Sequence, residues 1–179
     1  MSGTVAEKGL EQSPSAGKRR QIRPKAERRQ QLIDATMRGS APQGLSAITL
    51  QMVTREAGLS VGIANLHFQS KDNLLRETLR FVAEEYHGGQ IQIMEGAAIT
   101  DLGERLDALL DFQLGRGVTQ RQKMSVWFAY YGEAGARPVY QKIVSTVDRL
   151  AAQKLETLFE AIIAEAHYEG GDAQELAPG

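Results

Sequence analysis

Apolar side chains recur every three or four positions along most of this chain, which is the period of one face of an α-helix. In the first third of the sequence the pattern predicts three short helices. The first begins near Lys25 and should break at the GSAPQG stretch from Gly39 to Gly44, because glycine and proline disfavour helix interiors. The second runs from Leu50 to Ala57, and the third runs from Val61 to about His67.

Polar residues of the type that caps helix N-termini precede three of the predicted helices. Thr49 can cap the second helix, Ser60 can cap the third, and Ser70 opens a fourth. Gly58 supplies a permissive turn residue between the second and third helices. The third helix is barely two turns long and too short to stand alone, so we expect its neighbours to hold it.

The rest of the chain reads as helix, without a convincing strand. An apolar face leads from Leu74 toward Tyr86, and the pair Gly88-Gly89 marks a weak point or kink after it. Another helix starts at Asp101 and should close at Gly115 and Gly117.

Two further helices complete the predicted body. The stretch from Met124 to Tyr131, which Thr119 can cap, is apolar nearly all round and should therefore be buried on most sides. Pro138 suits the first turn of a long amphipathic helix that continues to about Ala166 and ends at Gly170-Gly171. The predicted fold class is all-α, with an N-terminal three-helix head and a C-terminal helical body.

Charge separates the head from the body. The net charge of the 179 residues is -1, but residues 1–71 hold 11 Lys and Arg against 5 Asp and Glu, while residues 72–179 hold 10 against 17. A basic head suits a polyanion such as DNA, whereas phosphates would repel an acidic body. Chance clustering of charges is the alternative reading of this asymmetry.

Composition narrows the classes of protein to consider. The chain has no cysteine, which excludes disulfides, thiolate metal sites and a cysteine nucleophile. It lacks both the apolar core of a signal peptide and the roughly 20 apolar residues that span a bilayer. We therefore expect a cytoplasmic protein that has no contact with membranes.

Candidate catalytic chemistry is missing from the sequence. The histidines His67, His87 and His167 lie far apart, and none has a metal-ligand neighbour at helical spacing. No phosphate loop, nucleophile elbow or pair of inward carboxylates is present. The sequence therefore predicts no catalytic residue, no metal site, no cofactor and no enzyme.

The second and third predicted helices have the dimensions of a helix-turn-helix. They are short and joined by a tight turn, and small residues at Ala57, Gly58 and Gly62 let them approach closely. Such a pair can insert its second helix into the major groove of DNA. The spacing alone fits an ordinary helical hairpin as well as it fits a helix-turn-helix.

The run TLQMVTREAGLSVGIANLHFQSKDNLL, from Thr49 to Leu75, closely resembles the DNA-binding domain of the TetR family of repressors. The resemblance implies that the third helix reads the major groove and that Lys71 contacts a phosphate. A lysine at a helix N-terminus is also a reasonable anion site on physical grounds. The DNA-binding residues implied by this resemblance are Thr49, Gln51, Ser60, Val61, Gly62, Ile63, Asn65, His67 and Lys71.

This sequence departs from the family pattern at several positions. Asn65 and His67 stand where the family often has tyrosine, Ala64 is small for an inward position, and Gly39 with Pro42 interrupts a normally continuous first helix. Asn65 can still pair with adenine or donate to a phosphate, and His67 can reach a phosphate. For both residues the alternative is capping or surface solvation. The basic run Lys18 to Arg29 is expected to form a minor-groove arm or a solvated tail.

The body resembles one branch of that family, the choline-responsive repressors that control glycine-betaine synthesis. The likeness lies in the RRQQLIDAT stretch from Arg28, in the stretch from Met124 to Tyr131 and in the Pro-Val-Tyr opening at Pro138. A quaternary ammonium ligand is held by ring faces, and the implied effector-binding residues are Trp127, Phe128, Tyr130 and Tyr131. There are two alternatives: these four aromatic residues belong to an ordinary hydrophobic core, or they bind a different hydrophobic effector.

Family members usually add two C-terminal helices that pair with a second subunit. The family therefore implies a homodimer, whereas this sequence ends at Gly179 and is expected to lack the usual dimer surface. The predicted domains are a flexible basic tail (1–24), a DNA-binding domain (25–71), an effector-binding domain (72–169) and a flexible tail (170–179).

These observations predict a repressor of operator DNA that a small-molecule effector releases by shifting the helix from Asp72 to about His87. The alternative is a shortened TetR-like protein that acts as a protein-interaction module with impaired DNA binding.

Overall fold

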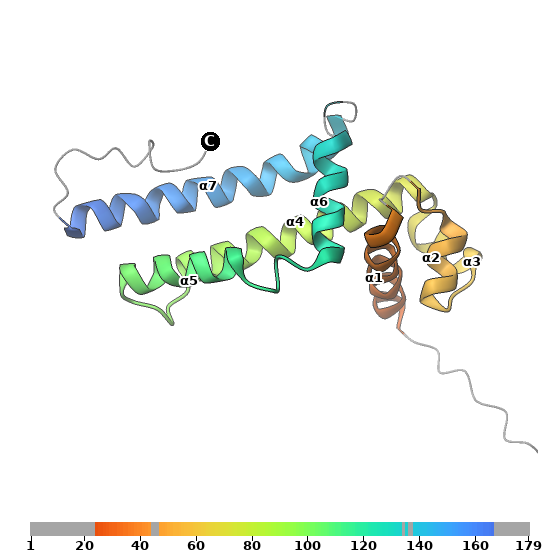
Figure 1. The fold of residues 1–179 in the computed structure, drawn as a ribbon, viewed down its shortest axis with the longest axis horizontal. Coiled ribbons are helices and arrows are strands. Elements are labelled where there is room, and N and C mark those ends of the chain that lie inside the picture. The colour runs from red at the N-terminus through yellow and green to blue at the C-terminus, as the bar shows by residue number, and fades with distance from the viewer. Residues whose placement is uncertain (1–23, 44–46, 134, 136–137, 167–179) are drawn as a thin grey trace, which may run out of the picture.

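The computed structural model describes residues 24–43, 47–133, 135 and 138–166. Within these residues the chain forms seven α-helices and no strand (Figure 1), which confirms the predicted all-α fold. The helices are α1 (Lys25–Gln43), α2 (Leu50–Ala57), α3 (Val61–Phe68), α4 (Lys71–Glu95), α5 (Leu102–Leu114), α6 (Arg121–Glu133) and α7 (Pro138–Ala166). None of these helices is long and apolar enough to cross a membrane.

Helix α4 connects the head to the body (Figure 1). Its first turns contact α1 and α3, while α5 and α7 pack along its later turns and α6 crosses it. With 25 residues, α4 is roughly 37 Å long. One rigid element therefore extends from the DNA-binding candidate residues into the middle of the body.

The larger of two apolar clusters extends through both parts of the molecule. Leu32 and Ile33 of α1 are fully buried in the same cluster as Val126 of α6 and Tyr140 of α7. A second, smaller cluster contains Met94, Leu109 and Leu158 and lies farther along α4, α5 and α7. Head and body are thus packed together, and the predicted domain boundary after residue 71 falls in the first turn of α4.

The polar caps predicted from the sequence are confirmed at three helices. The hydroxyl of Thr49 accepts a hydrogen bond from the backbone N–H of Met52, and Ser60 and Ser70 accept equivalent bonds at the starts of α3 and α4. Asp101 caps α5 in the same way. These local interactions explain why the observed starts of α2, α3 and α4 agree with the prediction.

The first helix ends at Gln43, within the stretch from Gly39 to Gly44 that the sequence predicts to break it, but the interruption expected at Gly39 and Pro42 is wrong because α1 continues through both. Carbonyl groups in the last turn of a helix have no partner within it. Here the carbonyl of Ser40 accepts a hydrogen bond from the hydroxyl of Ser125 in α6, at 2.9 Å. Packing of α6 against α1 therefore supports a final turn that glycine and proline would not form by themselves.

Helix α4 continues without a break through the pair Gly88-Gly89 to Glu95, where the sequence predicts a weak point or kink. Gly89 is needed for a different reason. A Cβ atom at this position would lie 2.3 Å from Cζ of Phe112 in α5, whereas one at Gly88 would meet nothing within 4 Å. The glycine at position 89 thus permits a close approach of α5.

Helix α6 differs from the prediction in its start and its burial. It begins at Arg121, and the hydroxyl of Thr119 donates to the Gly115 carbonyl at 3.1 Å instead of capping the helix. Val126 is fully buried, but Phe128 is 68% exposed and Tyr131 is 71% exposed. Neighbouring helices therefore cover one side of α6 and not most of it.

The predicted helix end at Gly170-Gly171, and most of the basic run from Lys18, lie outside the described residues. Both remain predictions.

Candidate nucleic-acid interface and ligand cavity

Helices α2 and α3 meet at a tight turn. Gly58 adopts a left-handed conformation with φ of 63°, and its backbone N–H donates to the carbonyl of Arg55. A side chain would be strained in this conformation. The small residues Ala57 and Ala64 are buried between the helices, and Phe68 anchors the end of α3 in the core. The two short helices are therefore fixed in a helix-turn-helix arrangement.

The exposed side of α3 carries most of the predicted DNA-binding residues. Val61, Gly62 and Asn65 are exposed, while Ile63 and His67 are half-buried at its flanks. Thr49, Gln51 and Ser60 are exposed as well, so the start of α2 and the exposed side of α3 both present candidate contacts.

Lys71 stands at the start of α4, the helix that connects the head to the body. It is the first residue of α4, where the side chain of Ser70 accepts a hydrogen bond from the backbone N–H of Asn73 at 3.1 Å. The positive end of the helix dipole and the charge of the lysine add together at this position. The geometry favours an anion beside Lys71.

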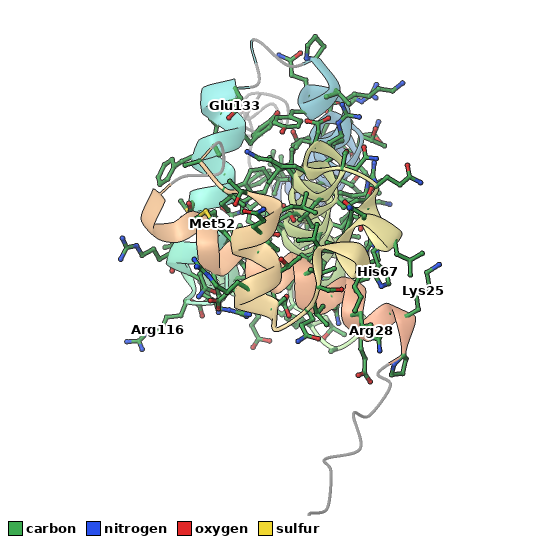
Figure 2. The ribbon with its side chains drawn as sticks, turned by 90° about the vertical axis from the view of Figure 1, so that its right-hand side faces the viewer. Lys25, Arg28, Met52, His67, Arg116 and Glu133 are labelled. Carbon is green, nitrogen blue, oxygen red and sulfur yellow. The ribbon has the colours of Figure 1, made fainter. Side chains whose placement is uncertain are left out.

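Basic residues at the start of α1 lie beside His67 (Figure 2). Burial lowers the pKa of His67, and the positive charges of Lys25, Arg28 and Arg29 lower it further. The guanidinium of Arg29 lies 5.6 Å from the ring centroid of Phe68 and also pairs with Glu77 of α4. The first turns of α1 therefore add positive charge to one edge of α3.

A second candidate site is a cavity of about 320 Å³ in the body, which we call the aromatic cavity. It is lined by residues of α4, α6 and α7, the end of α5 and the loop that follows α5: Tyr86, His87, Gln113, Val118, Thr119, Met124, Trp127, Tyr131 and Asp148. Its volume lies in the range of small-molecule sites. An adjoining groove of about 490 Å³ shares four of these residues and follows α4 and α7 toward Leu155.

Trp127 is the centre of the rings around this cavity. Its ring centroid lies 5.9 Å from that of Tyr86, in an edge-on arrangement, and 6.1 Å from that of Tyr131, nearly stacked. Tyr86 also stacks on Phe112 of α5 at 6.1 Å. Burial raises the pKa of Tyr86, so this phenol stays neutral. The rings thus form a surface of π faces with no positive charge of their own.

One carboxylate lies among these rings. Oδ1 of Asp148 is 2.8 Å from Nε2 of His87, although the two atoms are not aligned for a hydrogen bond. On its other side, Nδ1 of His87 contacts Oε1 of Gln90 at 3.1 Å. Which of the two ring nitrogens of His87 donates in these contacts depends on the tautomer of the ring.

The protonation of His87 follows from its surroundings. Burial lowers its pKa, while the charge of Asp148 and the contact with Gln90 act in the opposite direction and do not fully offset it. His87 is therefore neutral at pH 7, and the carboxylate of Asp148 is free of a formal positive charge from this neighbour.

The structure brings together some of the predicted effector residues and not others. Trp127 and Tyr131 line the aromatic cavity. Tyr130 packs edge-on against Trp127 at 5.9 Å but is not part of the lining, and Phe128 points to solvent.

Seven of the nine lining residues were not among the predicted effector residues, and Tyr86, His87 and Asp148 are the ones that matter most for a ligand. The sequence carries a signal for Asp148. Val144, Ala151 and Leu158 are the buried residues of α7 at seven-residue spacing, and Asp148 occupies the same stripe between the first two. A carboxylate that shares a helix face with buried apolar residues is a signal for a binding site, and here the side chain of Asp148 is half exposed at the cavity.

Two different family models match the head and the body of this chain. The model of the bacterial regulatory proteins of the tetR family matches residues 32–78, and that of the C-terminal part of BetI-type transcriptional repressors matches residues 103–179. The transcriptional regulator BetI of Rhizobium meliloti (strain 1021) is 29% identical over 153 residues, which cover 85% of this chain and 71% of that protein. A BetI of Chromohalobacter salexigens is 27% identical over 152 residues, with coverage of 85% and 71%.

Solved structures share the fold. A transcriptional regulator from Pseudomonas aeruginosa PAO1 superimposes with a TM-score of 0.73 at 21% identity, over 89% of this chain and 76% of that one. A regulator from Saccharomonospora viridis, solved in complex with choline, gives a TM-score of 0.73 at 25% identity, over 85% and 78%. The protein is a DNA-binding transcriptional regulator and not an enzyme, with a TetR-family N-terminal domain and a BetI-type C-terminal domain.

Proposed function

We propose that this protein is a repressor that a quaternary ammonium cation of the choline type releases from operator DNA. The observation that carries the proposal is the carboxylate of Asp148 beside the rings of Tyr86, Trp127 and Tyr131 in one cavity. The BetI-type C-terminal domain and the choline bound to the structural neighbour from S. viridis support the same ligand.

The chemistry of the aromatic cavity suits such a cation. A quaternary ammonium group cannot donate hydrogen bonds, so ring faces hold it, with about 0.5–2 kcal/mol for each contact. Asp148 supplies the counter-charge, and neutral His87 does not compete for it at pH 7. A purely hydrophobic effector would gain nothing from Asp148.

Two helices connect the cavity with the head. Tyr86 and His87 belong to α4, whose first residue is Lys71. Trp127 of α6 is two residues from Ser125, whose hydroxyl donates to the carbonyl of Ser40 at the end of α1. A cation that displaces Trp127 or turns α4 would therefore shift α1 and the helix-turn-helix, which is how such repressors can leave DNA.

The proposed DNA contacts are the exposed side of α3, the start of α2 and Lys71. Replacing Lys71 with alanine is expected to weaken operator binding and to reduce the salt slope by about one unit, because one phosphate contact is lost. Fluorescence anisotropy with the DNA upstream of its own gene, over a salt series, measures both quantities. Lys142→Ala, an exposed lysine of α7, is the matched control and should bind as the unchanged protein does.

Equal affinity of the unchanged protein for scrambled DNA would contradict the repressor function itself. An unaltered salt slope in Lys71→Ala would contradict the phosphate contact alone.

Choline binding is expected to weaken as the pH falls below about 6.5, the ordinary pKa of histidine. Burial lowers the pKa of His87, so the folded protein takes up this proton only below that value, and the imidazolium then repels the cation and pairs with Asp148. The other groups facing the site are Tyr86 and Gln90 from α4, Tyr131 from α6, and Arg149 from α7.

Titration of the fluorescence of the single tryptophan, Trp127, with choline between pH 5 and 7.5 measures this effect. The affinity should fall by up to about tenfold in the unchanged protein. In His87→Gln it should stay constant over that range. Identical pH profiles of the two proteins would exclude His87 as the group responsible.

We further infer that the protein acts as a homodimer in the cytoplasm, where operator DNA lies. Palindromic half-sites about 34 Å apart need two heads, and one head alone binds weakly. Sedimentation equilibrium of the full chain, with and without operator DNA, measures the assembly.

A further inference from the structure

The outward side of the recognition helix α3 is unusually apolar. Leu66 is 72% exposed and Val61 is 38% exposed, and no other large hydrophobic side chain in the described part of the head is as open. On the inner side of the same helix, Ala64 and Phe68 are buried. With 100° between successive residues, Leu66 points directly away from the midpoint of that buried pair.

Packing within the chain does not explain this leucine. Leu66 belongs to neither of the two apolar clusters in the described residues, whereas Leu50 and Leu59 of the same head pack against the main one. An isolated exposed leucine needs no explanation by itself. Its position matters here, because it is the most outward residue of the helix that enters the major groove in this proposal.

The neighbours of Leu66 leave room for close contact with base edges. Gly62, one turn earlier, lies on the same face and presents no side chain. A Cβ atom at Gly62 would meet Ser60 Oγ at 3.8 Å, an ordinary distance, so packing does not require glycine there. Within α3, Asn65 is the exposed side chain that can form hydrogen bonds with bases.

The major groove offers one apolar group to such a surface, the C5-methyl group of thymine. We propose that Leu66 reads a thymine methyl group in the operator, so that part of the sequence specificity comes from apolar contact and not from hydrogen bonds. This inference rests on the proposed binding of α3 in the major groove. It assigns Leu66, which was not among the residues implied by the family resemblance, as a specificity-determining residue.

Replacing thymine by deoxyuridine removes the methyl group and leaves the hydrogen-bonding groups of the base pair unchanged. The operator is first selected from randomised duplex DNA with the full chain, and each thymine of the selected site is then replaced singly. In each half-site, one of these single replacements is expected to weaken binding by about fourfold, because a buried methyl group contributes about 0.8 kcal/mol. Fluorescence anisotropy at constant salt measures the change.

The variant Leu66→Ala tests whether this leucine makes the contact. It should bind the thymine operator several-fold more weakly than the unchanged protein and should not distinguish thymine from deoxyuridine. Because Leu66 is exposed, its thermal unfolding should be unchanged. Leu114→Ala, which removes a leucine that is 80% exposed in the body, is the matched control and should retain the full response to deoxyuridine.

Two results would overturn the inference. In the first, no thymine replacement affects the unchanged protein; in the second, Leu66→Ala remains as sensitive to deoxyuridine as the unchanged protein. Failure of the chain to select any DNA sequence would instead reject operator binding, and the inference with it.

Discussion

Asp148→Asn is expected to weaken choline binding by about tenfold or more, which corresponds to at least about 1.4 kcal/mol. The carboxylate is the counter-charge that the aromatic cavity offers to a cation, and asparagine keeps its shape without the charge. The side chain of Asp148 is half exposed, so solvent reduces the electrostatic attraction well below that of a buried pair. Isothermal titration calorimetry at pH 7.5 measures the difference.

An uncharged isostere of choline, 3,3-dimethyl-1-butanol, provides the sharper comparison. The unchanged protein should prefer choline to the isostere, and Asp148→Asn should lose most of that preference. Glu160→Gln removes an exposed carboxylate from the same helix outside the cavity and should change neither affinity. Equal binding of choline to Asp148→Asn and to the unchanged protein would show that the rings alone hold the ligand.

Two adjacent glycines of α4 are expected to respond in opposite directions to the same substitution. Gly89→Ala places a methyl group where Cζ of Phe112 already lies, at 2.3 Å, and should destabilise the fold by about 1–3 kcal/mol. Gly88→Ala meets nothing within 4 Å and should stabilise α4 by up to about 1 kcal/mol, because alanine favours the helix.

Thermal unfolding monitored by circular dichroism separates the two variants. Each kcal/mol corresponds to a shift of roughly 2–4 °C in the Tm for a chain of this size. Gly89→Ala should also weaken choline binding, since a displaced Phe112 loses its stacking on Tyr86. A rise in the Tm of Gly89→Ala equal to that of Gly88→Ala would contradict the close packing of α5 on α4.

Most of the head was predictable because its signals are local. The bounds of α2 follow from the cap at Thr49 and the left-handed turn at Gly58, which act within one or two turns of the chain. The third helix extends one residue beyond the prediction, to Phe68. The start of α5 was predicted at Asp101, which is the cap just before Leu102, and α7 begins at Pro138 as predicted.

The candidate site in the body was predictable only in part. The aromatic residues of α6 are visible in the sequence, but which of their rings face a cavity depends on the helices beside them. Trp127 and Tyr131 meet Tyr86 and Asp148 there, while Phe128 faces solvent. Asp148 lies on the apolar stripe of α7, and its partner His87 is on another helix.

The sequence by itself determined the helical class, the helix-turn-helix and the separation of a basic head from an acidic body, because caps, turns, periodicity and charge are properties of neighbouring residues. The tertiary structure decided whether glycines break or permit a helix, and which polar and aromatic side chains form a cavity. Gly89 accommodates Phe112, and the end of α1 is supported by Ser125, which is 85 positions from Ser40 in the chain. Contacts over such separations depend on how the helices pack, and this packing is not encoded in any short stretch of the chain.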